Sequence, residues 1–413
     1  MEMTIGKVLA GGGRATLGVL VGLQVLDSVD GVMLVVFAPE ISRSLGIGTE
    51  TMATLAALAA VMVAVAALPL GLLGDRHRRT TIAGAATLVW AAAAGLLGTV
   101  QHLWQAVVLR VVSGVGKANE GPIQSSLLVD AYPRDGRGRV LGLHRGGQPL
   151  GIVVGPLLAA AFAALVPVEN EPWRWAFAFL AVPALLLGLG AFRLPEPSRE
   201  HSTATPRGAL TQLLGIRTFV LAALGLGAFG MAVTTVPTYL SVLLDRQLGQ
   251  DAMARGLITS ACAVGGLAGA ALSGWLSDRL FRFSPKGCLY LAAVALTLLG
   301  VGFAVQAHAP DVTTYVVVGV LTQAMTFAGI VPLSLVVAAV TPHEIRATAF
   351  ALMGVCTAAI GGLGGALVTG VAKGLWGEQT AVTVVAPAGS VLAGVVLVVS
   401  ARHVLGDIAR LVR

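Results

Sequence analysis

The chain has 413 residues, of which 56% are hydrophobic and 11% are charged, whereas about 25% charged residues is usual in soluble domains. A soluble fold could not bury so much apolar surface, so the composition excludes a soluble globular protein. The net charge of +7 does not indicate nucleic-acid binding, because the basic residues fall in short loops between apolar runs. The three cysteines lack metal-ligand spacing, so we expect no metal site, no disulfide and no cofactor.

A membrane-spanning helix needs about 20 consecutive, mostly apolar residues. Twelve such runs follow one another along the chain, near 15–39, 50–73, 81–100, 104–131, 140–165, 173–193, 217–243, 253–276, 287–306, 312–340, 347–372 and 379–402. The first run is too long for the apolar part of a signal peptide, so we expect it to remain as a span. The predicted fold is an all-α membrane protein with twelve transmembrane helices.

The longest polar connection, 194–216, separates the sixth run from the seventh. Two short segments of the first half recur in the second half: 71–79 matches 274–282, and 133–143 matches 342–352. Such internal repeats are typical of transporters built from two related halves. We predict a six-helix bundle over 1–193, a cytoplasmic linker over 194–216 and a second six-helix bundle over 217–413.

The distribution of Lys and Arg predicts the orientation, because cytoplasmic loops collect basic residues. With the first residue inside, nineteen Lys and Arg residues fall on the side of both termini and five on the other side. We therefore expect a multi-pass protein of the inner (plasma) membrane with both termini in the cytoplasm. The charge pattern thus reflects topology and not a nucleic-acid partner.

The loops after the second and eighth spans share a Gly-x-x-x-Asp-Arg pattern. Its residues are Gly71, Asp75 and Arg76 in the first half, and Gly274, Asp278 and Arg279 in the second half. This pattern resembles the signature loop of the major facilitator superfamily. The resemblance implies a gating role: the glycine lets two helices approach closely, and the aspartate pairs with an arginine or a helix N-terminus across the two halves.

The fourth span begins with Arg110, followed by Gly114 and Gly116, which matches a second pattern of the same superfamily. Within the superfamily, the segment 114–133 looks most like the spinster-type branch. Lys117 departs from that branch, which has an acid at this position.

The fifth span carries Gly151, Gly155 and Pro156. This segment resembles a motif that is associated with antiporters and efflux in the superfamily. Ordinary packing of small residues between helices is the alternative explanation.

The first and fourth spans contain ionisable and polar residues, namely Asp27, Asp30, Arg110, Lys117, Glu120 and Gln124. The two spans run in opposite directions, so a rise of about 1.5 Å per residue places Asp30 level with Arg110 and Asp27 level with Lys117. Ions inside a membrane mark functional sites by default. We predict proton coupling by Asp30, Arg110, Asp27 and Glu120, with Lys117 and Gln124 as substrate contacts. The alternative is a purely structural ion network.

The matching positions of the second half carry no charge, so the first half is expected to couple protons. Weakly polar residues there are candidate substrate contacts: Thr234, Tyr239, Gln323 and Thr326. For any one of them, helix packing is the alternative.

A phosphate-binding Gly-x-x-x-x-Gly-Lys-Ser/Thr loop does not occur in the sequence, and no enzymatic site can be assembled from it. The preferred function is proton-coupled export of amphipathic or hydrophobic organic molecules by alternating access, with Asp30 as proton carrier and Arg110 as its partner. The first alternative is a proton symporter that imports an organic anion held by Arg110 and Lys117. A membrane receptor without transport is a further alternative. We expect a monomer whose partners are a small-molecule substrate, protons and the lipid bilayer.

Overall fold

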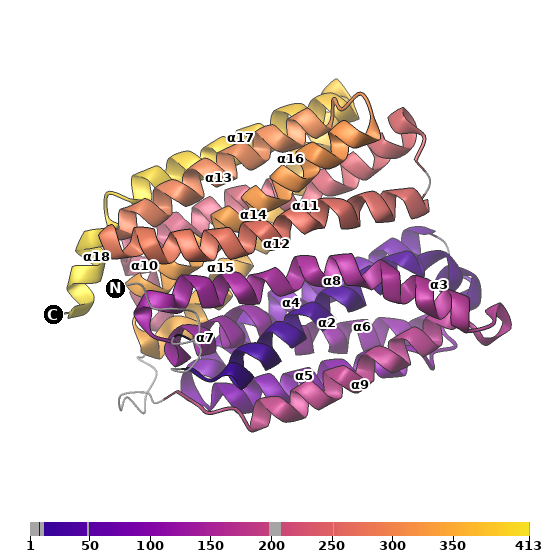
Figure 1. Cartoon of the computed structure of the whole chain (residues 1–413), viewed down its shortest axis with the longest axis horizontal. Coiled ribbons are helices and arrows are strands. Elements are labelled where there is room, and N and C mark those ends of the chain that lie inside the picture. Colours follow the sequence, from indigo (N-terminus) through magenta and orange to yellow (C-terminus); the bar gives the residue numbers. More distant parts are fainter. Residues whose placement is uncertain (1–7, 9–11, 48, 198–207, 251, 413) are drawn as a thin grey trace.

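The fold is known from a computed structural model, which describes residues 8, 12–47, 49–197, 208–250 and 252–412. All elements in these residues are helical, and they lie along one another in two groups that follow the two halves of the sequence (Figure 1). The side chains of Thr234 and Tyr239 lie outside the described part of the structure, although their backbones are helical.

The first half consists of α2 (Arg14–Val36), α3 (Ala38–Leu45), α4 (Thr49–Arg76), α5 (Arg79–Leu97), α6 (Leu103–Lys117), the π-helix η1 (Glu120–Gln124), α7 (Ser125–Ala131), η2 (Arg134–Gly136), α8 (Arg137–Leu165), η3 (Val168–Asn170) and α9 (Pro172–Phe192). The segments α6, η1 and α7 together form the fourth span. A π-helix is a local widening of an α-helix and is frequent at functional sites.

The second half consists of α10 (Ala209–Gly215), α11 (Arg217–Leu248), α12 (Ala252–Phe283), α13 (Pro285–Gln306), α14 (Val312–Val340), η4 (His343–Ile345), α15 (Arg346–Cys356), the π-helix η5 (Thr357–Gly364), α16 (Gly365–Trp376), α17 (Glu378–Ser400) and α18 (Val404–Val412). The predicted linker is not wholly irregular, because α10 lies within it and meets α11 at 90°. Residues 198–207 of the linker lie outside the described residues. The ranges given for the two bundles stay a prediction.

In the described part of the chain, ten helices are long and apolar enough to cross a membrane, and α10 with α11 adds an eleventh. The fourth span is absent from this set. It is divided by η1, and it carries Arg110, Lys117 and Glu120 among its apolar residues. The charges that make this span a candidate site therefore also weaken its signal as a membrane helix.

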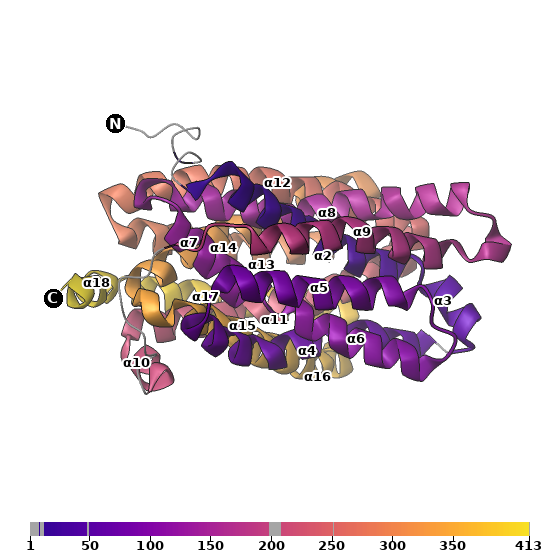
Figure 2. The same cartoon turned by 90° about the horizontal axis from the view of Figure 1, so that it is seen from below.

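The two halves meet where α4 packs against α15 and where α8 packs against α12, as Figures 1 and 2 also show. We call the end of the molecule that holds Asp75, Asp278, α10 and α18 the basic end. At that end a Cβ atom on Gly71 would lie 2.7 Å from Cβ of Ala351, and one on Gly274 would lie 2.8 Å from the carbonyl of Gly138. Glycine is therefore required for this close approach between the halves.

Candidate functional site

Asp30 and Arg110 form a buried ion pair between α2 and α6. Arg110 Nη1 lies 3.2 Å from Asp30 Oδ2, and Lys117 Nζ lies 2.7 Å from the same oxygen. The Asp30 side chain is 0% exposed and that of Arg110 is 4% exposed. Matching depth in the two spans thus brings the acid and the base together, and Lys117 adds a second cation to Asp30.

Asp27 pairs with Lys117, one helical turn from Asp30. Lys117 Nζ lies 2.6 Å from Asp27 Oδ1 and donates to the Asp27 backbone carbonyl at 3.2 Å. The ammonium also lies 5.3 Å from the centre of the Trp90 ring on α5, within range of a cation–π interaction. Lys117 therefore links both acids of α2, and its predicted role as a substrate contact stays a prediction.

Glu120 opens the π-helix η1 and pairs with Arg145 of α8. Arg145 Nη1 donates to Glu120 Oε1 at 3.0 Å, and Nη2 reaches Ser125 Oγ at 3.5 Å. The Glu120 side chain is 25% exposed and that of Arg145 is 18% exposed. This pair therefore borders accessible space, in contrast to the sealed pair of Asp30 and Arg110.

Gln124 ends η1 and belongs to a buried chain of hydrogen bonds. The Gln124 amide donates to Asn119 Oδ1 at 3.0 Å, and Asn119 donates to the Gly116 carbonyl at 2.7 Å. The Gln124 oxygen must then accept from Nε2 of His144, which lies 3.0 Å away. Gln124 thus fixes α8 against the fourth span, and it is 3% exposed.

The six ions of this cluster balance in charge. Three acids, Asp27, Asp30 and Glu120, face three bases, Arg110, Lys117 and Arg145. An unpaired charge in such a place is expensive. A single added charge would therefore leave the cluster unbalanced.

Both signature aspartates lie at helix N-termini of the opposite half. Asp75 accepts from the backbone N–H groups of Ala347 and Thr348 on α15, each at 3.0 Å. Asp278 accepts from the backbone N–H groups of Gly138 and Arg139 on α8, at 2.6 and 3.1 Å. A carboxylate at a helix N-terminus satisfies free N–H groups and interacts favourably with the helix dipole. These contacts join the halves at the basic end, and the gating role of the motif stays a prediction.

The arginines in and beside the signature loops lie in different environments. Arg76 and Arg279 are exposed, and Arg279 stacks on Trp275 at 5.6 Å. Arg79, three residues further on than Arg76, is buried instead and pairs with Asp130 at 2.5 Å and with Glu196 at 3.1 Å.

Asp130 also connects the two halves, because it pairs with Arg346 at the start of α15 as well as with Arg79. The Arg346 guanidinium donates in addition to the carbonyls of Ala338 and Thr341, at 3.0 and 3.3 Å. Sequence reasoning missed this group, although Arg79 and Arg346 both lie in segments that recur in the two halves of the sequence.

The fifth-span glycines pack against α2. A Cβ atom on Gly151 would lie 2.5 Å from Cβ of Ser28, and one on Gly155 would lie 2.8 Å from Cγ1 of Val32. Pro156 follows within α8. Close packing against α2 explains these glycines, and the efflux role that the motif implies stays a prediction.

The candidate contacts of the second half are described only in part. Thr326 donates its hydroxyl to the Thr322 carbonyl at 3.2 Å, within its own helix α14. Gln323 is partly buried on the same helix. The expectations for Thr234 and Tyr239 fall on side chains outside the described part of the chain.

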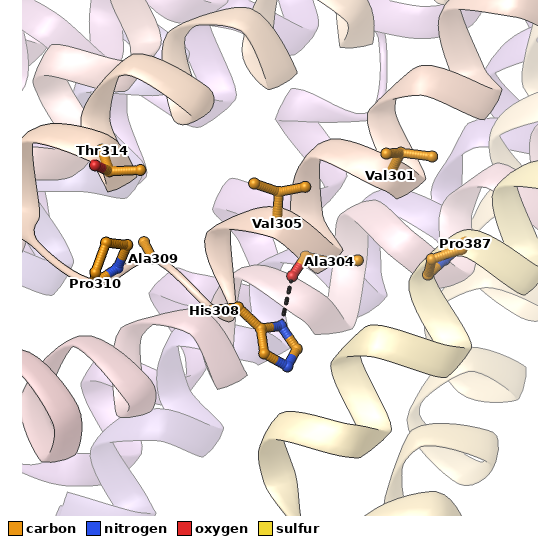
Figure 3. A pocket seen from close by; sticks show the side chains of 8 residues that line it. All are labelled: Val301, Ala304, Val305, His308, Ala309, Pro310, Thr314 and Pro387. Atoms are coloured by element: carbon orange, nitrogen blue, oxygen red, sulfur yellow. Dashed lines mark hydrogen bonds between the residues drawn. The ribbon is translucent and has the colours of Figure 1, made fainter.

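A cavity of about 450 Å³ lies away from the ions, between α13, α14 and α17 (Figure 3). It is mostly apolar and is bordered by His308, Pro310 and Pro387. His308 Nδ1 donates to the Ala304 carbonyl at 3.0 Å. None of the predicted site residues borders this cavity, so it does not belong to the ion cluster.

Arg145 is the main site residue that sequence reasoning missed. The loops account for twenty-four of the 27 Lys and Arg residues, and the remaining three are Arg110, Lys117 and Arg145. That count would have identified Arg145 as an intramembrane base. Only α8 packing against the fourth span shows that Glu120 is its partner.

Residues 20–366 match the Major Facilitator Superfamily, and the chain belongs to this family of membrane transporters. The match confirms the superfamily resemblance and the all-α fold with twelve transmembrane helices. In a solved bacterial homologue of the human lysosomal transporter spinster, inward-facing and unoccupied, the same fold recurs with a TM-score of 0.61, at 19% identity over 96% of this chain and 97% of that chain.

Two relatives carry names that refer to organic acids or lactones. A probable 4-methylmuconolactone transporter of Cupriavidus pinatubonensis is 26% identical over 286 residues, and the match spans just under two thirds, 66%, of each chain. The gentisate transporter of Corynebacterium glutamicum is 23% identical over 358 residues, which cover 83% of this chain and 78% of the relative.

Proposed function

We propose that the protein is a proton-coupled secondary transporter that carries a small organic anion across the inner membrane by alternating access. The observation that carries this proposal is the charge balance of the ion cluster. A carboxylate that entered alone would leave one buried negative charge without compensation. One proton on Asp27, Asp30 or Glu120 restores the balance, so anion and proton favour each other's binding.

The names of the relatives support an anionic substrate. One transports gentisate, an aromatic acid, and another is a probable transporter of a muconolactone. Transport of organic anions therefore takes precedence here over export of amphipathic molecules, the function preferred from the sequence.

Export of amphipathic molecules remains a second proposal. Its support is the motif of Gly151, Gly155 and Pro156. Because both glycines face α2 at close range, packing explains them equally well.

The orientation is also part of the proposal. The excess of Lys and Arg at the basic end supports a cytoplasmic location for that end and for both termini. The contacts of Asp75 and Asp278 would then close the cytoplasmic side. The pair of Glu120 and Arg145 would be reached from the opposite side.

Purified protein in proteoliposomes tests the function. Labelled gentisate is offered under an imposed pH gradient with the membrane potential clamped, and a trapped pH dye records proton movement. We expect gentisate to accumulate on the alkaline side, with proton movement that empty liposomes lack. Gradient-driven movement of a hydrophobic dye such as ethidium, with no gentisate flux, would favour the export proposal instead.

A further inference from the structure

The geometry points to Arg145 as the binding site for the substrate carboxylate, with Glu120 occupying that site while the protein is empty. We propose that an entering carboxylate displaces Glu120 from Arg145 and that the released Glu120 takes up the coupled proton. This inference rests on the proposed function and names the residues that exchange anion and proton.

The Arg145 guanidinium has donors to spare. Its bond to Glu120 is a single contact at 3.0 Å, and its approach to Ser125 Oγ is long, at 3.5 Å. Its Nε is buried and has no hydrogen-bond partner among the described residues. A guanidinium binds a carboxylate best through two parallel N–H groups. Arg145 can therefore make a better contact with a small carboxylate than the one it makes with Glu120.

Accessibility separates this pair from the pair of Asp30 and Arg110, although Asp27 is also partly exposed. Glu120 and Arg145 are 25% and 18% exposed, whereas Asp30 and Arg110 are 0% and 4% exposed. Asp30 is moreover held by two cations at once. A substrate can therefore reach Arg145 without breaking the buried pair.

The groups around Glu120 explain why it would take up a proton after displacement. The charged groups that act on it are Arg145 from α8, Lys117 from α6 and Asp27 from α2, and Gln24 of α2 is a polar neighbour. Lys117 is already committed to Asp27 and Asp30. Once the substrate holds Arg145, Glu120 is left beside the like charge of Asp27, and protonation relieves that repulsion. The added anion and proton leave the net charge of the cluster unchanged.

The exchange is also connected to the basic end. Arg145 lies on α8, whose first turn donates to Asp278 through Gly138 and Arg139. Arg145 is seven residues beyond Gly138, about 10 Å along the helix axis. His144, beside Arg145, ties the same helix to η1 through Gln124. A shift of α8 upon substrate binding would therefore reach the contacts that join the halves.

The test measures binding of benzoate and gentisate to purified protein by calorimetry between pH 5 and pH 8. In the native protein we expect the affinity to fall by about tenfold per pH unit at the alkaline end, because one proton binds with each anion. In Glu120→Gln the pH dependence should disappear, with binding at pH 8 at least as tight as in the native protein. Arg145→Gln should lose binding by tenfold or more at every pH, and Arg145→Lys, which keeps the charge, should retain part of it.

Arg402→Gln, which removes an exposed cation at the basic end, serves as a matched control and should leave binding unchanged. Unchanged pH dependence in Glu120→Gln, or no benzoate and gentisate binding to the native protein, would overturn the inference. The proton and gentisate fluxes of the native protein decide the proposed function separately. Coupled gentisate and proton flux in the native protein, together with pH-dependent binding in Glu120→Gln, would support the proposed function but reject this site. The proton carrier would then be Asp30 or Asp27.

Discussion

At the scale of single residues, Asp30 is the acid that contacts two of the three intramembrane bases. One of its oxygens contacts both Arg110 and Lys117, and the side chain is fully buried. Such a group is hard to protonate from solvent but well placed to position two cations. Removing one partner of a buried ion pair costs more than removing both, because a single deletion leaves an uncompensated charge.

Asp30→Asn should therefore destabilise the protein by about 3–5 kcal/mol, whereas the double variant Asp30→Asn, Arg110→Gln should recover most of that loss. Thermal unfolding of the detergent-purified variants measures both effects. Asp27→Asn is the matched comparison. Because Asp27 is 28% exposed, this substitution should lower the free energy of unfolding by less. An Asp30→Asn protein as stable as the native protein would contradict this view of the pair.

Glu196, just beyond α9, gives a prediction for acid pH. Burial alone would raise the pKa of its carboxyl, but hydrogen bonds from the Thr80 N–H and the charge of Arg79 outweigh burial and hold the pKa below its usual value of 4.5. A lowered pKa stabilises the folded state above pH 4.5, and this contribution is lost as the pH falls through the folded-state pKa.

Glu196→Gln should accordingly lower the unfolding temperature at pH 7 and flatten the loss of stability between about pH 5 and pH 3. Unfolding temperatures recorded across that range measure the change. Glu40→Gln, which removes an exposed surface pair with Arg43, should leave the acid slope as it is. If the unfolding temperature fell equally steeply with pH in the native protein and in Glu196→Gln, Glu196 would not contribute to the loss of stability in acid.

At the scale of elements, two helices begin against the opposite half of the molecule. The N-terminus of α15 is bound by Asp75, and that of α8 by Asp278. Replacing such a capping side chain by Ala costs about 0.5–2 kcal/mol. Here that energy stabilises the arrangement in which the basic end is joined.

Asp75→Ala should therefore shift the equilibrium toward a state open at the basic end, up to about thirtyfold for 2 kcal/mol. A cysteine introduced at the buried Ala351, in a background without the native cysteines, should be alkylated faster in this variant. Arg78→Ala, at an exposed position of the same loop, is the control. Identical alkylation rates in both backgrounds would mean that the cap does not hold this end together.

Arg174 connects several elements at the end of the first half that lies opposite the basic end. It donates to the carbonyls of Gly98 and Val100 at 3.2 and 2.5 Å and to Ser44 Oγ at 3.1 Å, so it connects α9 with the end of α5 and with α3. Arg174→Ala should cost about 1–3 kcal/mol because buried acceptors lose their donor. The unfolding temperature of Arg174→Lys should lie between those of Arg174→Ala and the native protein, because lysine lacks the planar donor group of arginine.

At the scale of the whole molecule, the orientation can be tested directly. A cysteine introduced at the exposed Arg402, near the end of α17, should react with an impermeant maleimide only after the cells are opened. A cysteine at Arg43, which is 74% exposed at the other end, should react in intact spheroplasts. The reverse pattern would invert the topology and exchange the sides on which the protein opens and closes.

Hydropathy determined the number of spans, and short recurring sequence segments determined the internal repeat and the superfamily. These are local properties: a membrane demands a run of apolar residues of fixed length, and this demand can be read one segment at a time. The contact between Asp30 and Arg110 was predictable for the same reason, because depth in the membrane follows from counting residues along two spans. A fourth span over 104–131 was expected from the sequence even though its charges reduce its hydropathy, but its division by η1 was not.

Only the tertiary structure decided which partners the remaining charges take. Arg145 pairs with Glu120 across 25 residues, Arg79 with Asp130 across 51 and with Glu196 across 117, and Arg346 with Asp130 across 216. These pairs depend on which faces of the helices meet and on the rotation that the π-helix η1 introduces after Lys117. Depth fixes one coordinate of a side chain, whereas an ion pair requires all three, and packing between distant helices supplies the other two.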